Sequence, residues 1–118
     1  MINVLIKSPG KTPQVTEINP SLHVFRQIVG GDIEPVSIDV SGIAFYCNEF
    51  GKIQGLDPNF NLIMSNGKIF DIVVGTVVFF RINNNCEEVS LSADDIEYIK
   101  KWLSARSIRR TVRRRVSQ

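Results

Sequence analysis

The sequence is poor in the residues that build metal centres, disulfide frameworks and catalytic triads. It contains two cysteines, Cys47 and Cys86, and one histidine, His23, among its 118 residues. These three residues cannot complete a four-ligand zinc site without carboxylates, and no ligand spacing is evident, so we expect no bound metal. We interpret the two cysteines as reduced thiols, buried by packing, in a cytoplasmic protein. A single imidazole without a second base cannot form a triad, and we place His23 on the exposed side of a helix.

Motifs of known enzyme classes are also missing. The chain has no glycine-rich phosphate loop, no His-Glu zinc motif and no nucleophile elbow. Glu49 and Asp71 could act as a pair of carboxylates, but nothing in their spacing brings them together. Gly30-Gly31 follows a predicted helix instead of opening one, which is typical of a helix C-cap. The sequence therefore predicts a protein that is not an enzyme and that carries no cofactor.

No segment is apolar over a length that would cross a membrane. The densest run, residues 69–80, is interrupted by Asp71, Gly75 and Thr76 and is far shorter than the roughly 20 residues of a transmembrane helix. The first residues include neither a basic region nor a small-residue cleavage site, so we expect no secretion signal. We therefore predict a cytoplasmic location and no membrane partner.

Negative charge is absent from the C-terminal end of the chain. Residues 100–118 contain eight lysines and arginines and no acidic residue. Residues 1–99 hold the other six basic residues and all twelve acidic ones, a net charge of −6. The formal charge of +2 thus combines an acidic body with a basic end. This asymmetry indicates an anionic partner, which could be a nucleic acid, a phosphorylated small molecule, a lipid surface or an acidic protein face.

Short apolar or alternating stretches bounded by turn residues predict the strands. We expect them at residues 2–6, 14–18, 33–38, 43–47 and 69–82. The near-continuous hydrophobicity of residues 69–82 predicts one central strand buried on both faces, with a bulge at Gly75. Residues 52–68 are rich in glycine, proline and asparagine, and we expect an irregular loop there that ends in a tight turn at Asn66-Gly67.

Two helices complete the predicted fold. Ser21 is the expected N-cap of the first helix, and Ser92 with Asp95 forms a weak capping box for the second. Apolar residues at helical spacing are Leu22, Phe25, Ile28 and Val29 in the first helix and Ile96, Ile99 and Leu103 in the second. We predict an α+β fold, a twisted and mostly antiparallel β-sheet with one short helix and a C-terminal helix. Residues 1–103 form one domain, and residues 104–118 form a basic amphipathic extension.

The extension combines arginines with a second apolar stripe. The predicted anion-binding or partner-binding residues are Arg106, Arg109, Arg110, Arg113 and Arg114. On a continuous helix Ile108, Val112 and Val116 would lie opposite the stripe that docks on the sheet. Either the helix breaks near residues 104–107 and folds back, or the second stripe packs on another chain and makes a homo-oligomer, which is the interpretation we favour. A solvated extension without a partner is the third alternative.

Four polar residues in the body are candidates for ligand binding. Asn48, Lys52 and Asn59 belong to predicted turns, where binding residues are often displayed. The alternative is that such residues only satisfy the backbone geometry of turns. Arg81 is a charge near the end of the most apolar strand, where it either extends to solvent or reaches a ligand pocket.

The order of several short motifs resembles a small family of uncharacterised proteins from phages, plasmids and bacterial genomes, known only as a domain of unknown function. The motifs are VLI at 4–6, PGK at 9–11, VGGDIE at 29–34, CNEFGK at 47–52, GL at 55–56 with Asn59, DIVVGT at 71–76 and SLS at 90–92. The resemblance covers residues 1–103 and leaves the arginine-rich end outside. Phe50 departs from the family pattern, which more often has a second acidic residue at this place.

The resemblance implies a setting in which small accessory proteins of mobile elements act against host defences. Our first hypothesis is a non-enzymatic binding protein in the host bacterial cytoplasm, which blocks a defence effector such as a CRISPR effector or sequesters its nucleotide signal. The alternative is a nucleic-acid-binding accessory protein that uses the arginine-rich end. Membrane attachment is weaker, because the second apolar stripe lacks the Trp, Phe and Leu anchors of interfacial helices.

Overall fold

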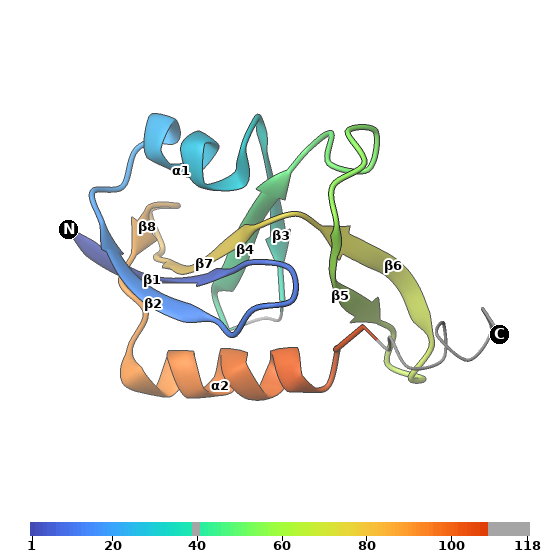
Figure 1. Ribbon diagram of the computed structural model, residues 1–118. Helices are drawn as coiled ribbons and strands as arrows, with labels where there is room; N and C mark the ends of the chain where they lie inside the picture. The colour runs from blue at the N-terminus through green and yellow to red at the C-terminus, as the bar shows by residue number, and fades with distance from the viewer. Residues whose placement is uncertain (39–40, 109–118) are drawn as a thin grey trace, which may run out of the picture.

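A six-stranded antiparallel sheet carries one helix on each face and a two-stranded arm at its side (Figure 1). The computed structural model describes residues 1–38 and 41–108. The elements are β1 (Ile2–Lys7), β2 (Gln14–Ile18), α1 (Leu22–Val29), β3 (Ile33–Ser37), β4 (Ile43–Asn48), β5 (Pro58–Ile63), β6 (Ile69–Val74), β7 (Val77–Ile82), β8 (Glu88–Val89) and α2 (Ala93–Ser104). The predicted α+β fold with a C-terminal helix is confirmed.

Strand β7 is the centre of the sheet. The strand order is β2-β1-β7-β4-β3, and β8 pairs with the end of β7. Phe79 of β7 lies opposite Leu5 of β1 on one side and Phe45 of β4 on the other. Strand β7 therefore joins the N-terminal hairpin to the β3–β4 hairpin.

Each face of the sheet has its own hydrophobic core, because successive side chains of a strand point to opposite faces. On β7, Val77 and Phe79 belong to the core beneath α2, whereas Val78 and Phe80 belong to the core beneath α1. The α2 core also contains Leu5, Phe45, Phe60, Ile99 and Leu103, and the α1 core contains Val4, Phe25, Val29 and Ala44. Helix α2 therefore docks through the predicted apolar stripe, and α1 docks through Phe25, Ile28 and Val29. Leu22, the fourth residue of the predicted α1 stripe, is exposed.

The prediction of one central strand over residues 69–82 is wrong. The segment is divided between β6, which pairs with β5 in a separate two-stranded sheet, and β7. Gly75 has a φ of 77°, a left-handed conformation that turns the chain between the two strands. The apolar residues of β6 are not all buried: Ile69 is 57% exposed and Phe70 is 61% exposed.

Strand β5 corrects a second prediction, that residues 52–68 form an irregular loop. The strand begins at Pro58, a place where the missing N–H of proline is tolerated. The tight turn is confirmed, since Gly67 has a φ of 87° and its N–H donates to the Met64 carbonyl at 2.9 Å. Strands β5 and β6 together form the arm, residues 58–74, which lies beside the main sheet in Figure 1.

The ends of both helices follow the predicted capping residues. The Ser21 hydroxyl accepts from the Val24 N–H, and Gly30 ends α1 with a φ of 81°. Ser92 and Asp95 form a complete capping box at the start of α2. Helix α2 ends at Ser104, and the chain then runs along the free edge of β5, where the Asn61 N–H donates to the Arg106 carbonyl at 2.9 Å.

Candidate functional site: a lysine-lined pocket

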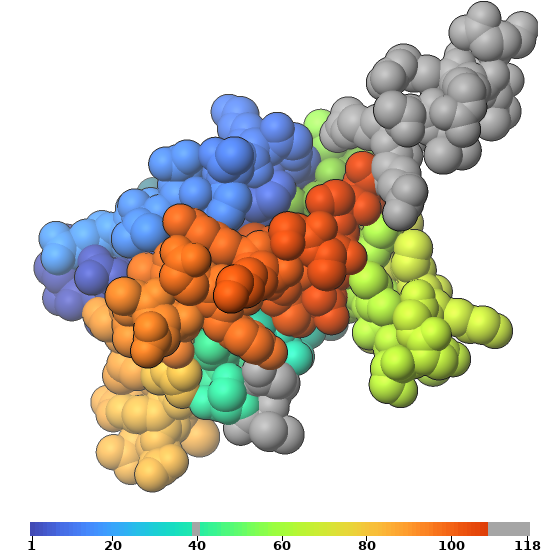
Figure 2. Space-filling model, turned by 90° about the horizontal axis from the view of Figure 1, so that it is seen from below, coloured from blue at the N-terminus to red at the C-terminus, as the bar shows by residue number. Residues whose placement is uncertain are grey.

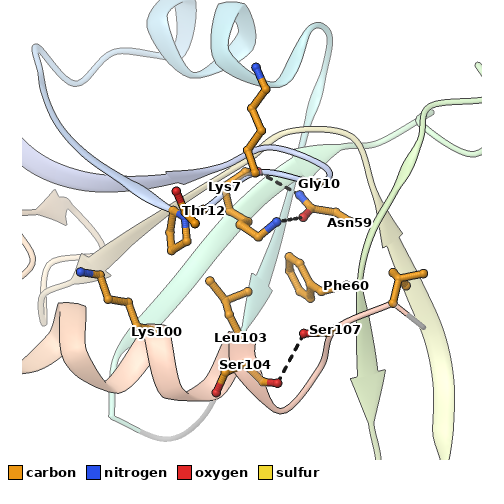
Figure 3. Close-up of a pocket in the computed structure, with 12 residues that line it drawn as sticks. Lys7, Gly10, Thr12, Asn59, Phe60, Lys100, Leu103, Ser104 and Ser107 are labelled. Carbon is orange, nitrogen blue, oxygen red and sulfur yellow. Dashed lines mark hydrogen bonds between the residues drawn. The ribbon is translucent and has the colours of Figure 1, made fainter. Parts of the chain in front are cut away.

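A pocket of about 720 Å³ opens between the β1–β2 hairpin loop, the start of β5 and the end of α2 (Figure 3). It is lined by Lys7, Gly10, Lys11, Thr12, Pro13, Asn59, Phe60, Lys100, Leu103, Ser104, Ser107 and Ile108. In Figure 2, α2 in orange lies between the N-terminal hairpin in blue and the arm in yellow-green. The pocket thus forms where three segments that are distant in sequence meet.

Asn59 fixes the inner end of this pocket. The side chain is buried, and its Nδ2 donates to the carbonyls of Lys7 at 2.9 Å and Gly75 at 2.8 Å. Its Oδ1 accepts from the Lys7 Nζ at 2.9 Å, and the same ammonium donates to the Ser8 carbonyl. One amide therefore ties the end of β1 to the arm and holds the Lys7 side chain over Phe60, as Figure 3 shows.

The pocket gathers positive charge without a carboxylate. Lys7, Lys11 and Lys100 line it, and no aspartate or glutamate of residues 1–38 and 41–108 does. In the described part of the chain, the ion pairs join Arg26 to Asp32, Lys52 to Asp71 and Arg81 to Asp95, and none includes a pocket lysine. Burial lowers the pKa of Lys7, whose hydrogen-bond acceptors are neutral oxygens. A net-negative body thus has a locally cationic pocket.

Hydroxyls and apolar side chains complete the lining. Thr12, Ser104 and Ser107 supply hydroxyl groups, while Phe60, Leu103 and Ile108 supply apolar surface. Lys100 extends from α2 to the outer rim in Figure 3, whereas Lys7 is held inside by Asn59. The hydroxyls of Ser104 and Ser107 donate to the carbonyls of Lys101 and Ser104. The Thr12 hydroxyl accepts from the Gln14 side chain, so its own proton can be donated to a phosphate that the flexible lysine ammoniums reach. The chemistry of this lining fits a phosphorylated ligand with an apolar portion.

The four predicted ligand-binding residues do not share one site: Asn48 and Lys52 line a second groove, and Arg81 lines neither this groove nor the lysine-lined pocket. Asn59 alone lines the lysine-lined pocket. Asn48 is buried and holds a turn, because its Nδ2 donates to the Val29 carbonyl at 3.3 Å and its Oδ1 accepts from the Phe50 N–H at 2.9 Å. Lys52 pairs with Asp71, and Arg81 pairs with Asp95. In the described residues, Asn48 and Arg81 thus have structural partners.

Of the predicted arginines, the structure describes Arg106. Its guanidinium carbon lies 4.0 Å from the centre of the Trp102 ring, and its Nη1 donates to the Trp102 carbonyl at 2.9 Å. Desolvation lowers the pKa of Arg106. Ile108 lines the lysine-lined pocket of its own chain. The other predicted tail residues, Arg109, Arg110, Val112, Arg113, Arg114 and Val116, lie outside the described residues.

Several expectations about single residues change. Cys86 is exposed and has a φ of 61°, so burial by packing is wrong for this thiol, whereas Cys47 is half-buried. His23 is exposed on α1, as predicted. Glu49 and Asp71, which nothing in the sequence brings together, line one groove with Lys52.

Sequence reasoning missed Lys7, Lys11, Thr12 and Lys100 as site residues. The Pro9-Gly10-Lys11 loop was visible as a turn, and Lys100 as part of α2, but their proximity depends on the packing of α2 against the hairpin. One feature of the sequence could have indicated the site. Residues 1–99 contain few lysines, and two of them, Lys7 and Lys11, belong to the same hairpin.

Residues 2–104 match the family described as a domain of unknown function, DUF3846, and the chain belongs to this family. No curated protein and no solved structure gives a significant match. Neither helix of the described residues has the length and hydropathy required to cross a membrane.

Proposed function

We propose that the protein is a non-enzymatic binding protein that captures a phosphorylated small molecule in the lysine-lined pocket. The observation that carries this proposal is the gathering of Lys7, Lys11 and Lys100 in a pocket without carboxylates, on a body whose net charge is −6. The resemblance to proteins of phages and plasmids supports an anti-defence role in a bacterial cytoplasm, in which the captured molecule is a nucleotide signal of the host.

The energetics favour a polyanion over a neutral ligand. An ammonium 4 Å from a phosphate oxygen gains about 4 kcal/mol at the effective dielectric constant of a protein surface, before desolvation is subtracted. Two or three such contacts outweigh the loss of hydration only when the ligand carries several charges. The pocket volume of about 720 Å³ lies within the roughly 300–1,000 Å³ of ordinary ligand pockets. A nucleotide meets both conditions.

Calorimetric titration with nucleoside mono-, di- and triphosphates and with cyclic dinucleotides tests the proposal. We expect at least one of them to bind, with affinity at least about tenfold weaker, or about 1.4 kcal/mol, in Lys100→Met and in Lys11→Met. Lys68→Met is the matched control, because Lys68 is exposed beside the turn of the arm and does not line the pocket. Binding that is unchanged in both pocket variants would contradict the proposal, as would no binding at all.

The alternative function is nucleic-acid binding through the arginine-rich end. The observation in its favour is that Ser107 and Ile108 line the lysine-lined pocket directly before Arg109 and Arg110, so that a phosphate backbone could pass from one to the other. Its affinity for DNA or RNA should fall with salt, with a log–log slope of about −0.9 for each duplex phosphate neutralised. A chain ending at Ile108 should lose this binding but keep nucleotide binding.

An anti-defence protein could also bind a defence effector directly, such as a CRISPR effector. Direct binding requires no small ligand, and in that case the Lys11 and Lys100 variants should inhibit the effector as well as the unaltered chain does. Inhibition that depends on Lys11 and Lys100 would instead favour capture of a nucleotide signal.

A further inference from the structure

A second concavity, of about 280 Å³, lies between β3, the 49–53 turn and β6, away from the lysine-lined pocket. We call it the acidic groove; its lining includes Glu34, Cys47, Glu49, Phe50, Ile53 and Ile72. Both strands beside it are at sheet edges, since β3 ends the order of the main sheet and β6 pairs only with β5 in the described chain. The groove is therefore bordered by strands that still have room for a partner.

Apolar side chains at the rim of this groove are exposed. Ile53 is 86% exposed, Phe50 is 45% exposed and Ile72 is 39% exposed. On β6, Ile69 and Phe70 are exposed as well, although neither lines the groove. Single exposed apolar residues are ordinary, but a contiguous group beside a groove is typical of an interaction surface.

The charge of the groove is negative. Glu34, Glu49 and Asp71 line it, and Lys52 is the one basic residue that the described part of the chain contributes to the lining. Lys52 pairs with Asp71, whereas Glu34 and Glu49 are exposed and take part in no ion pair within residues 1–38 and 41–108. A ligand for this groove should therefore be apolar and positively charged.

The chain itself has a segment of this chemistry. Residues 109–118 contain five arginines, together with Val112 and Val116, and no acidic residue. We propose that this segment of one copy docks in the acidic groove of a second copy, with valines against the exposed apolar rim and arginines beside Glu34 and Glu49. The proposal is independent of the ligand of the lysine-lined pocket.

Two observations favour a second copy over the groove of the same chain. Residues 106 and 107 lie along the edge of β5 that faces away from β6, as the pairing of Phe60 with Ser107 shows, so the arm stands between this point and the groove. Ile108, the residue that precedes the segment, lines the lysine-lined pocket, whose cations repel arginines. If each copy places its segment in the groove of the other, both segments are bound and the two copies form a closed dimer with two-fold symmetry.

Light scattering after size exclusion tests this docking on four chains. They are the full chain, a chain ending at Ile108, the groove variant Glu34→Lys/Glu49→Lys and the control Glu17→Lys/Glu97→Lys, which makes the same charge change at exposed sites outside the groove. We expect a dimer for the full chain and the control, and a monomer for the other two. Raising salt from about 0.1 M to about 1 M, which shortens the Debye length from about 10 Å to about 3 Å, should weaken the dimer.

A charge-reversal experiment excludes misfolding as the cause. The variant Arg113→Glu/Arg114→Glu should be monomeric alone and should form a heterodimer when mixed with the groove variant. A monomeric full chain would overturn the proposal and indicate an unbound segment or docking within one chain. A truncated chain that remains a dimer, or a groove variant that keeps the dimer, would also overturn it.

Discussion

Arg81 and Asp95 join the central strand to the C-terminal helix through two parallel hydrogen bonds. The Arg81 Nε donates to Oδ2 at 2.9 Å, and its Nη2 donates to Oδ1 at 2.6 Å. The same carboxylate accepts from the Ser92 N–H and thereby closes the capping box of α2. A charge at the end of the most apolar strand thus has a structural use, because it aligns the helix that covers the larger core.

Arg81→Met should destabilise the protein by about 2 kcal/mol, because Asp95 would lose its charged partner while its own side chain is only 10% exposed. Arg26→Met is the matched control, since the Arg26–Asp32 pair is about half exposed and should contribute less than about 1 kcal/mol. Urea unfolding monitored by Trp102 fluorescence measures both. Equal losses in the two variants would contradict this assignment.

Acid should remove the contribution of ionised Asp95 to the stability of the folded protein over a defined pH range. The hydrogen bond from Arg81 is the main cause that lowers the Asp95 pKa to about 2, compared with about 3.9 in an unfolded chain. A depressed folded pKa stabilises the protein above the unfolded value, and this stability is lost as pH falls from about 4 to about 2. Asp95→Asn should have a lower free energy of unfolding than the unaltered protein, and this difference should shrink as pH falls from about 4 to about 2. Urea unfolding at a series of pH values measures it. A constant difference would refute the linkage.

Gly75→Ala should destabilise the fold more than Gly67→Ala does. Both glycines have left-handed backbones, which cost a residue with a Cβ about 1–2 kcal/mol. A Cβ on Gly75 would lie 2.7 Å from the Leu56 Cδ1, whereas a Cβ on Gly67 meets nothing within 4 Å. We expect a further loss of about 1 kcal/mol or more for Gly75→Ala from this contact, measured by thermal and urea unfolding. Similar losses would show that Leu56 moves aside freely.

The two thiols should react at very different rates. Burial, with the negative charge of Glu34 and Asp71, raises the pKa of the Cys47 thiol to about 11, so that roughly one molecule in a thousand has a Cys47 thiolate at pH 8. Cys86 is exposed and should be alkylated first by iodoacetamide. Mass spectrometry of Cys47→Ser and Cys86→Ser assigns each rate. Fast labelling of Cys47 at pH 8 would contradict the expectation.

Local patterns predicted the elements whose determinants are local. Ser21 and Gly30 bound α1, and Ser92 with Asp95 begins α2, because caps act through neighbouring backbone groups. The division of residues 69–82 was missed because their hydrophobicity is continuous, although β6 pairs with β5, whereas β7 pairs with β1, β4 and β8. The spacing of hydrophobic residues in a sequence does not indicate which sheet a strand joins.

The candidate site was harder to predict for the same reason. Lys7 and Lys100 line one pocket because α2 packs beside the hairpin, and no spacing in the sequence encodes that arrangement. Asn59 was found as a polar turn residue, but its contact with Lys7 required the position of β5, which had been interpreted as loop. For Asn48 the alternative stated from the sequence, that the residue satisfies the backbone of a turn, agrees with its contact, since its Oδ1 accepts from the Phe50 N–H.

The place of β1 in the sheet has a consequence for how the chain is synthesised and folds. Leu5 pairs with Phe79, and this contact joins β1 to β7, a strand that is synthesised much later. Contacts between such distant positions slow folding, because a large loop must close before they form. The N-terminal hairpin therefore has an unpaired edge throughout most of translation, and the sheet is completed only after nearly the whole domain has emerged.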